Sequence, residues 1–100
     1  MKRRIRALKL VKLSPKAEKH KYKHEKLIRI WAIKYGDRTM DTIRIIKEHR
    51  KVYLPPLQGQ YATVYEVWGI GFVKSAFKLN QAIRIAKKYF HEKQRRWKRR

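Results

Sequence analysis

The basic residues of this chain are concentrated at its two ends, and this distribution limits which part can form a hydrophobic core. The 100 residues contain 29 Lys and Arg against seven Asp and Glu, a formal net charge of +22. Residues 1–26 hold eleven of the basic side chains and residues 84–100 hold nine, whereas Val52 to Val73 contains none. Since the chain is long enough for one domain, we expect a single core in the middle. The cation-free stretch is expected inside that core or away from any polyanionic partner.

We therefore predict a basic N-terminal arm at 1–26, one folded domain at 27–95 and a basic tail at 96–100 that continues the last helix. Between Ile5 and Leu13 the apolar residues are interspersed with Lys, so this part of the arm would either pair as a strand or lie in a groove. Ser14-Pro15 is typical of a helix start, so residues 15–26 are a candidate polar helix, and the arm is expected to be extended or helical when bound. Deleting the arm should leave the domain folded.

Several segments of the middle favour β-strands. Residues 27–35 are rich in β-branched and aromatic side chains and apolar on both faces, and residues 61–68 alternate between apolar and polar. Gly69-Ile70-Gly71 predicts a tight turn, after which 72–78 returns as a partner strand. Residues 39–47 are ambiguous, because Thr42 to Ile46 favours a strand while Met40, Ile43 and Ile46 have helical spacing. We favour the strand slightly.

The C-terminal segment carries the clearest helical pattern. Asn80 is a suitable N-cap. The apolar residues after it recur with the spacing of one helix face: Ala82, Ile83, Ala86, Tyr89 and Phe90. The predicted fold class is α+β, a small antiparallel sheet of three or four strands with this amphipathic helix packed on one face and a basic N-terminal arm. Seven aromatic residues would line the sheet, mostly as core, with Tyr61 or Tyr65 as a possible solvent-facing exception: Trp31, Tyr35, Tyr61, Tyr65, Trp68, Phe72 and Phe77.

The charge excess predicts a polyanionic partner, because a compact domain with this net charge repels itself. Candidate nucleic-acid-binding residues lie in the arm, on the polar face of the helix and in the tail. They are Lys2, Arg3, Arg4, Arg6, Lys9, Lys12, Lys16, Lys19, Lys21, Lys23, Arg84, Lys87, Lys88, His91, Arg95, Arg96, Trp97, Lys98, Arg99 and Arg100. The cations would contact phosphates. Trp97 would either stack on a base or sugar or fold back onto the core.

The sequence offers little support for metal binding or catalysis. His20 and His24 have the i, i+4 spacing of some zinc sites, but a third ligand is missing and lysines surround the pair, so no metal and no cofactor are predicted. Asp37, Asp41 and Glu48 could in principle serve a metal-dependent nuclease. On a helix Asp41 and Glu48 would share a face, and on a strand they would lie on opposite faces. The favoured interpretation makes these acids surface counter-charges to Arg38, Arg44 and Arg50, in a protein that is not an enzyme.

The basic residues at both ends, together with the absence of a helix-turn-helix, zinc-finger or zipper pattern, favour structured RNA over regular DNA. In composition and layout the chain resembles the small basic proteins that bind ribosomal RNA, for which we expect an archaeal source. Its single Asn and lack of Cys fit a thermophilic organism. We expect a cytoplasmic protein of the ribosome, in contact with ribosomal RNA and neighbouring proteins. The alternatives are a DNA-binding protein of chromatin or a virus, and the nuclease. No membrane partner and no small-molecule substrate are expected, since no apolar run approaches a membrane span and the basic start lacks the rest of a signal peptide.

Overall fold

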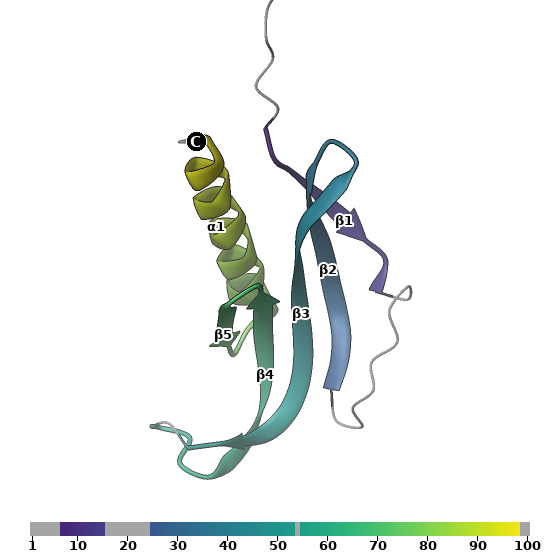
Figure 1. The fold of residues 1–100 in the computed structure, drawn as a ribbon. Coiled ribbons are helices and arrows are strands. Elements are labelled where there is room, and N and C mark those ends of the chain that lie inside the picture. The colour runs from purple at the N-terminus through teal and green to yellow at the C-terminus, as the bar shows by residue number, and fades with distance from the viewer. Residues whose placement is uncertain (1–6, 16–24, 54, 99–100) are drawn as a thin grey trace, which may run out of the picture.

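The computed structural model describes residues 7–15, 25–53 and 55–98. They form one antiparallel sheet of five strands followed by one helix (Figure 1). The strands lie in the sheet in the order in which they occur in the chain. The elements are β1 (Lys9–Leu13), β2 (Glu25–Tyr35), β3 (Arg38–Val52), β4 (Gln60–Gly69), β5 (Phe72–Ala76) and α1 (Leu79–Lys98).

The predicted α+β class is confirmed, but the sheet has five strands and the expectation of three or four was wrong. One additional strand is β1, which comes from the segment that we assigned to the N-terminal arm. Its residues pair with β2, from Lys9 opposite Lys34 to Leu13 opposite Ile30. Leu8, just before β1, is buried in the main core. Residues 8–13 therefore contribute to the folded sheet, as the strand alternative for this segment predicted.

β3 resolves the ambiguous segment in favour of a strand. It pairs with β2 from Arg38 to Glu48 and with β4 from Arg44 to Val52, so it has a neighbouring strand on at least one side throughout. Asp41, Ile43 and Ile45 alternate toward one face and are all buried. The helical spacing of Met40, Ile43 and Ile46 does not place them on one face, because Ile46 points to the other side of the sheet and a register irregularity separates Met40 from the regular alternation.

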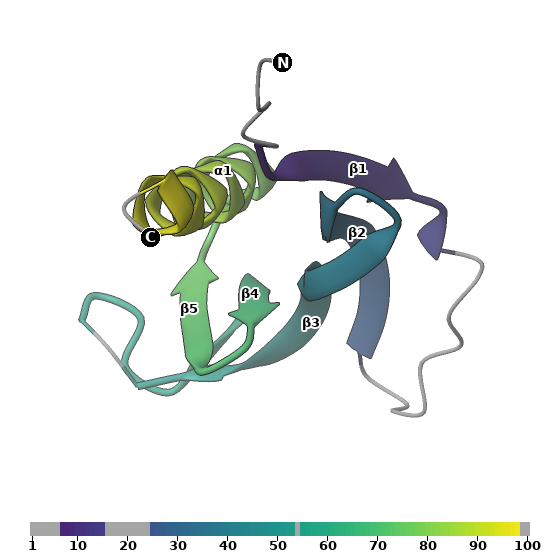
Figure 2. The same cartoon turned by 45° about the horizontal axis from the view of Figure 1, so that its top comes forward.

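The two faces of the sheet differ in what covers them. α1 packs against the face that carries Trp31, Ile33, Ile43, Ile45 and Val67, which we call the α1 face. The sheet curves around the helix on this side (Figure 2). The opposite side is called the outer face, and by strand alternation it carries the even-numbered residues of β4 and, from Thr42 onward, of β3. It also buries apolar residues, including Ile30 and Ala32. The prediction that the middle of β2 is apolar on both faces is thus confirmed.

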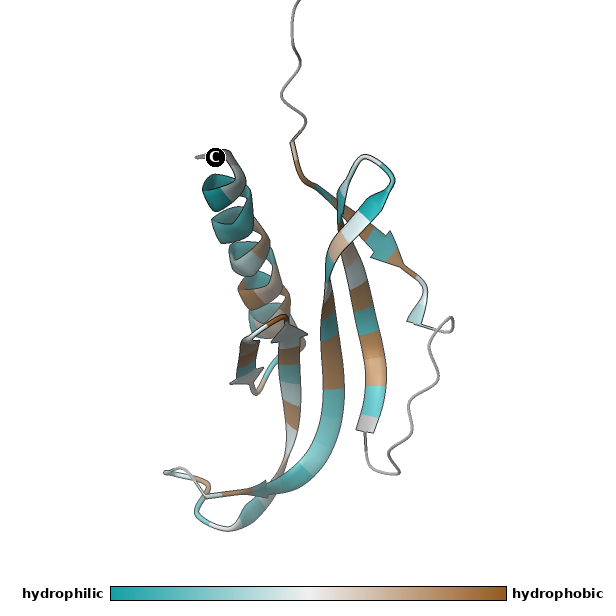
Figure 3. Ribbon diagram, viewed as in Figure 1, coloured by the Kyte–Doolittle hydropathy of each residue, from teal (hydrophilic) through white to brown (hydrophobic). Residues whose placement is uncertain are grey.

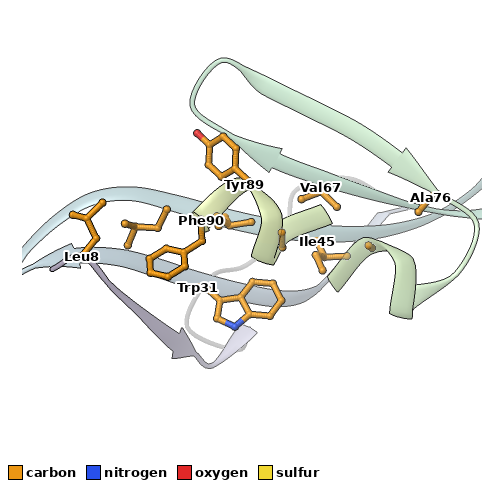
Figure 4. Close-up of a cluster of buried hydrophobic side chains, with 11 residues drawn as sticks. Leu8, Trp31, Ile45, Val67, Ala76, Tyr89 and Phe90 are labelled. Carbon is orange, nitrogen blue, oxygen red and sulfur yellow. The ribbon is translucent and has the colours of Figure 1, made fainter. Parts of the chain in front are cut away.

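The main core lies between α1 and the α1 face (Figure 4). Phe90 of the helix lies near Trp31 of β2, and Tyr89 projects toward the β4–β5 hairpin, where its ring centroid lies 4.6 Å from that of Phe72. Ala82 and Ala86 are almost fully buried. Because alanine lets the helix backbone approach closely, these positions set how near α1 lies to the sheet.

α1 follows the predicted apolar stripe but begins at Leu79, so Asn80 lies inside its first turn. The carbonyl group of Lys78 accepts a hydrogen bond from the Ala82 amide at 3.1 Å. Near its C-terminal end, Gln94 Nε2 donates to the Leu8 carbonyl at 3.4 Å. The helix therefore connects the last part of the chain to the segment before β1. In the described part of the chain, no helix combines the length and apolar character needed to cross a membrane.

Candidate nucleic-acid interface

The polar side of α1 carries a continuous row of four cations and one histidine. Arg84, Lys87, Lys88, His91 and Arg95 are exposed, and their spacing places them on the side of the helix opposite Ala82, Ala86 and Tyr89. We call these five residues the helix stripe. The helix stripe extends about 16 Å along the helix axis from Arg84 to Arg95, at a rise of about 1.5 Å per residue. Within the described residues, no carboxylate lies at ion-pair distance from Arg84, Lys87, Lys88 or Arg95.

The remaining candidates near the end of α1 are divided between surface and core. Arg96 is exposed, and it lines a small hollow of about 220 Å³ together with Leu8, Met40 and Trp97. Trp97 is half-buried and packs against the core, with its ring centroid 4.8 Å from that of Tyr35 and the planes tilted by 55°. The indole thus folds back on the domain, as one of the two alternatives for this residue predicted.

The candidates at the N-terminal side are only partly described. Lys9 and Lys12 are both exposed on β1, but they point to opposite faces of the sheet. They cannot contact the same flat surface. The other candidates, and most of the helix predicted within 15–26, lie outside the described residues, as do His20 and His24. These are Lys2, Arg3, Arg4, Arg6, Lys16, Lys19, Lys21, Lys23, Arg99 and Arg100, and of Lys98 only the backbone is described.

The structure adds a second cationic surface that the sequence analysis did not predict. On the α1 face, beyond the part covered by the helix, Lys47, His49 and Lys51 of β3 are exposed beside Tyr61 of β4. We call these four residues the hairpin surface. The far part of β3 that carries it is coloured as hydrophilic in Figure 3, as are the last turns of α1. Its signal in the sequence is the basic residue at every second position from 47 to 51, which identifies a surface only if this segment is a strand.

The two faces of this hairpin differ in whether their cations have acidic partners. On the outer face, Arg50 Nη1 lies 3.0 Å from Glu48 Oε1 and 3.2 Å from Glu66 Oε2, so this cation is neutralised. On the α1 face, none of the described carboxylates pairs with Lys47 or Lys51. The alternation of β3 thus places compensated charge on one side and uncompensated positive charge on the other.

Asp41 is buried, and our expectation that it is a surface counter-charge was wrong. Its Oδ2 accepts a hydrogen bond from the Tyr89 hydroxyl at 2.6 Å and lies 3.1 Å from Lys93 Nζ. Its Oδ1 accepts from the backbone amides of Thr42 at 2.7 Å and Ile70 at 3.3 Å. One carboxylate therefore joins β3, the β4–β5 turn and α1. Burial, followed by the hydrogen bond to Asp41 and the charge of that carboxylate, raises the pKa of the Tyr89 hydroxyl above its ordinary value.

The acids of the nuclease hypothesis are not brought together. Asp41 points toward α1 on one face, whereas Glu48 lies seven positions along the same strand on the outer face, where it pairs with Arg50. Asp37 is exposed in the β2–β3 turn. Over residues 7–15, 25–53 and 55–98, no three His, Cys, Asp or Glu side chains gather where they could hold a metal ion.

The aromatic residues expected to line the sheet are divided between core and surface. Trp31 is in the core, and Tyr35, Tyr65 and Phe72 pack against it. Tyr61, Trp68 and Phe77 are exposed, by 63%, 42% and 48% respectively. Trp68 projects from the outer face opposite Arg44. It lines a hollow of about 350 Å³ with Met40, Thr42, Arg44 and Ile70 among its neighbours.

Comparison of the chain with protein-family models, with curated proteins and with solved structures found no match.

Proposed function

We propose that this protein binds structured RNA through phosphate contacts and carries out no chemical step. The observation that carries the proposal is the helix stripe: its Arg and Lys side chains are exposed, aligned on a rigidly packed helix and unpaired with any described carboxylate. Where cations of this fold have internal partners, as Lys93 and Arg50 do, they lie beside buried or half-buried acids. The cations of the stripe lack such partners, and phosphates would supply the missing negative charge.

RNA is preferred over regular DNA because the cations are spread over more than one element. They occupy α1, the hairpin surface and the two chain ends, an arrangement suited to an irregularly folded polyanion. A helix-turn-helix protein needs a second helix next to the recognition helix, and the described residues contain α1 alone. Ribosomal RNA is the RNA class that we propose, on the composition and layout of the chain.

The proposal is tested by measuring binding to a folded RNA and to duplex DNA of matched length over a series of salt concentrations. Replacing Lys87 and Lys88 together by Gln should weaken RNA binding. It should also reduce the slope of log K against log salt by about 1.5, because each phosphate contact contributes about 0.7–0.9 to that slope. Replacing the same two residues by Arg keeps the charge and should leave the slope unchanged.

Two results would contradict the proposal. An unchanged slope in the Gln variant would show that the helix stripe does not contact phosphates, and tighter binding to duplex DNA than to folded RNA would favour the DNA-binding alternative. Co-purification of the protein with ribosomal particles tests the ribosomal assignment separately. If the protein binds folded RNA in solution but is absent from these particles, the assignment is wrong and RNA binding stands.

A further inference from the structure

The β3–β4 hairpin extends beyond the rest of the sheet. β3 pairs with β2 only as far as Glu48 opposite Glu25, and β5 ends at Ala76 opposite Tyr65. The β3–β4 pairing continues to Val52 opposite Gln60. His49–Val52 and Gln60–Thr63 are therefore a two-stranded ribbon with no third strand beside them in the described residues. The main core cluster includes no residue of this ribbon.

On the α1 face of the ribbon, the side chains of His49 and Tyr61 stack on each other. The rings of His49 and Tyr61 have centroids 5.6 Å apart and planes inclined by only 21°. Lys51 Nζ lies 5.7 Å from the centre of the Tyr61 ring. Tyr61 is nonetheless 63% exposed, and His49 and Lys51 are exposed too. A stacked aromatic pair with a cation over the Tyr61 ring is therefore exposed to solvent on this side of the ribbon.

A cross-strand aromatic contact also stabilises a two-stranded ribbon, which would explain Tyr61 and His49 without a ligand. That explanation does not account for the charge around them. Strand alternation places both acids of this region, Glu48 and Glu66, on the outer face with Arg50. Lys47 and Lys51 remain on the aromatic side without a described acidic partner. A cationic surface interleaved with exposed aromatic rings is the combination that single-stranded nucleic acids bind, because phosphates need the charge and bases stack on the rings.

We propose that the hairpin surface stacks an unpaired RNA base on the His49–Tyr61 pair while Lys47 and Lys51 bind the flanking phosphates. This inference rests on the proposed function and adds to it a class of RNA element. A base inside a continuous duplex is already stacked between its neighbours, so only loops, bulges and single-stranded junctions expose a base to this surface. The helix stripe contacts phosphates irrespective of base pairing, and the hairpin surface selects RNA that contains unpaired nucleotides.

The test compares two RNA probes of equal length at the same salt concentration, a hairpin with an unpaired loop and a fully paired duplex. Replacing Tyr61 by Leu in the full-length protein removes the ring and keeps an apolar side chain. Its affinity for the looped RNA should fall by about 5- to 150-fold, the range expected for losing one base–aromatic stacking contact. Its affinity for the duplex should stay within about 2-fold of the unsubstituted protein. Tyr61→Phe retains the ring and should bind both probes as the unsubstituted protein does.

Trp68→Leu is the matched control, since Trp68 is another exposed aromatic residue on the outer face of the same strand. It should leave the affinity for both probes unchanged. A fluorescent adenine analogue in the loop gives a direct measurement of stacking: its emission should be quenched by the unsubstituted protein and by Tyr61→Phe, and not by Tyr61→Leu. Thermal unfolding of each variant establishes that the ribbon change has not unfolded the domain.

Three outcomes separate this inference from the proposed function. Loss of loop binding in Tyr61→Leu alone supports the inference. If the protein binds RNA but Tyr61→Leu binds both probes normally or loses both equally, or if Trp68→Leu loses loop binding instead, the inference is wrong and the proposed function stands. If the unsubstituted protein binds neither RNA, the proposed function itself fails.

Discussion

Replacing Asp41 by Asn should destabilise the fold substantially, although the two side chains are nearly the same size. The carboxylate is buried and accepts hydrogen bonds from the Tyr89 hydroxyl and from the amides of Thr42 and Ile70, with Lys93 Nζ at 3.1 Å. Asn still accepts from the two amides, because both bind the same oxygen. Its NH₂ group, however, replaces the oxygen that accepts from Tyr89 and faces Lys93. The Tyr89 hydroxyl then keeps an acceptor only by turning its proton to the Ile70 carbonyl at 3.2 Å, and Lys93 loses its counter-charge.

The expected cost is about 2 kcal/mol. A hydrogen bond to a charged group contributes about 1.5–3 kcal/mol. Lys93 adds little to this loss because its side chain is 31% exposed, so its ammonium group can turn to solvent. For a domain of this size the change corresponds to a fall in Tm of about 8–16 °C.

The assay is urea-induced unfolding at moderate ionic strength, with the m-value confirming that both proteins unfold in the same way. Asp37→Asn is the matched control, since it removes the same charge from an exposed turn position and should change stability by no more than about 0.5 kcal/mol. In a double-mutant cycle, Asp41→Asn and Tyr89→Phe should couple by more than about 0.5 kcal/mol. The reasoning is refuted if Asp41→Asn costs no more than Asp37→Asn.

Three further predictions follow from the same region and from the N-terminus. Gly69→Ala should destabilise the protein by about 1–3 kcal/mol, because the added Cβ would lie 2.7 Å from Tyr89 Cε2 and Cζ, and that ring is held by Asp41. Gly71→Ala, where the space is open but φ is +67°, should cost about 1 kcal/mol. Equal urea midpoints for Gly69→Ala and the unsubstituted protein would contradict the close contact. The raised pKa of Tyr89 means that, as pH rises, the unfolded chain loses the hydroxyl proton before the folded protein does. Stability should therefore fall as pH rises above about 10, the ordinary Tyr pKa. In melts at a series of pH values, Tyr89→Phe should remove part of that loss, and Tyr53→Phe, at an exposed Tyr, should not. Deleting residues 1–6 should weaken RNA binding and leave Tm nearly unchanged. Deleting residues 1–13 should also lower Tm, because β1 and Leu8 are lost. Equal Tm values for the two truncations would show that β1 contributes nothing to stability.

Local sequence patterns predicted the elements whose residues carry one clear periodicity. β2, β4 and α1 lie close to their expected positions, because β-branched runs, strict alternation and an apolar helical stripe are properties of short segments. β3 was ambiguous for the same reason: its apolar residues fit two periods, and the strand is selected by β2 and β4 on either side. β1 is short and rich in Lys, and only its partner strand identifies it.

The contacts between residues that are far apart in the sequence were harder to predict. The partners of Asp41 on α1 are 48 and 52 positions away in the chain, so nothing near Asp41 in the sequence indicates burial. The helix stripe was predicted because it is local to one helix. The hairpin surface was not, since His49 and Tyr61 become neighbours only through the register between β3 and β4.

The order of the strands has a consequence for how the chain folds. Each strand pairs with the strand that precedes or follows it, so the loops that must close are short and the sheet can form progressively from local contacts. The contact between Leu8 and Gln94 is different, because it spans 86 positions and needs nearly the whole chain. The contact of α1 with the segment before β1 is therefore expected to form late in folding, after the helix has docked on the neighbouring strands β4 and β5.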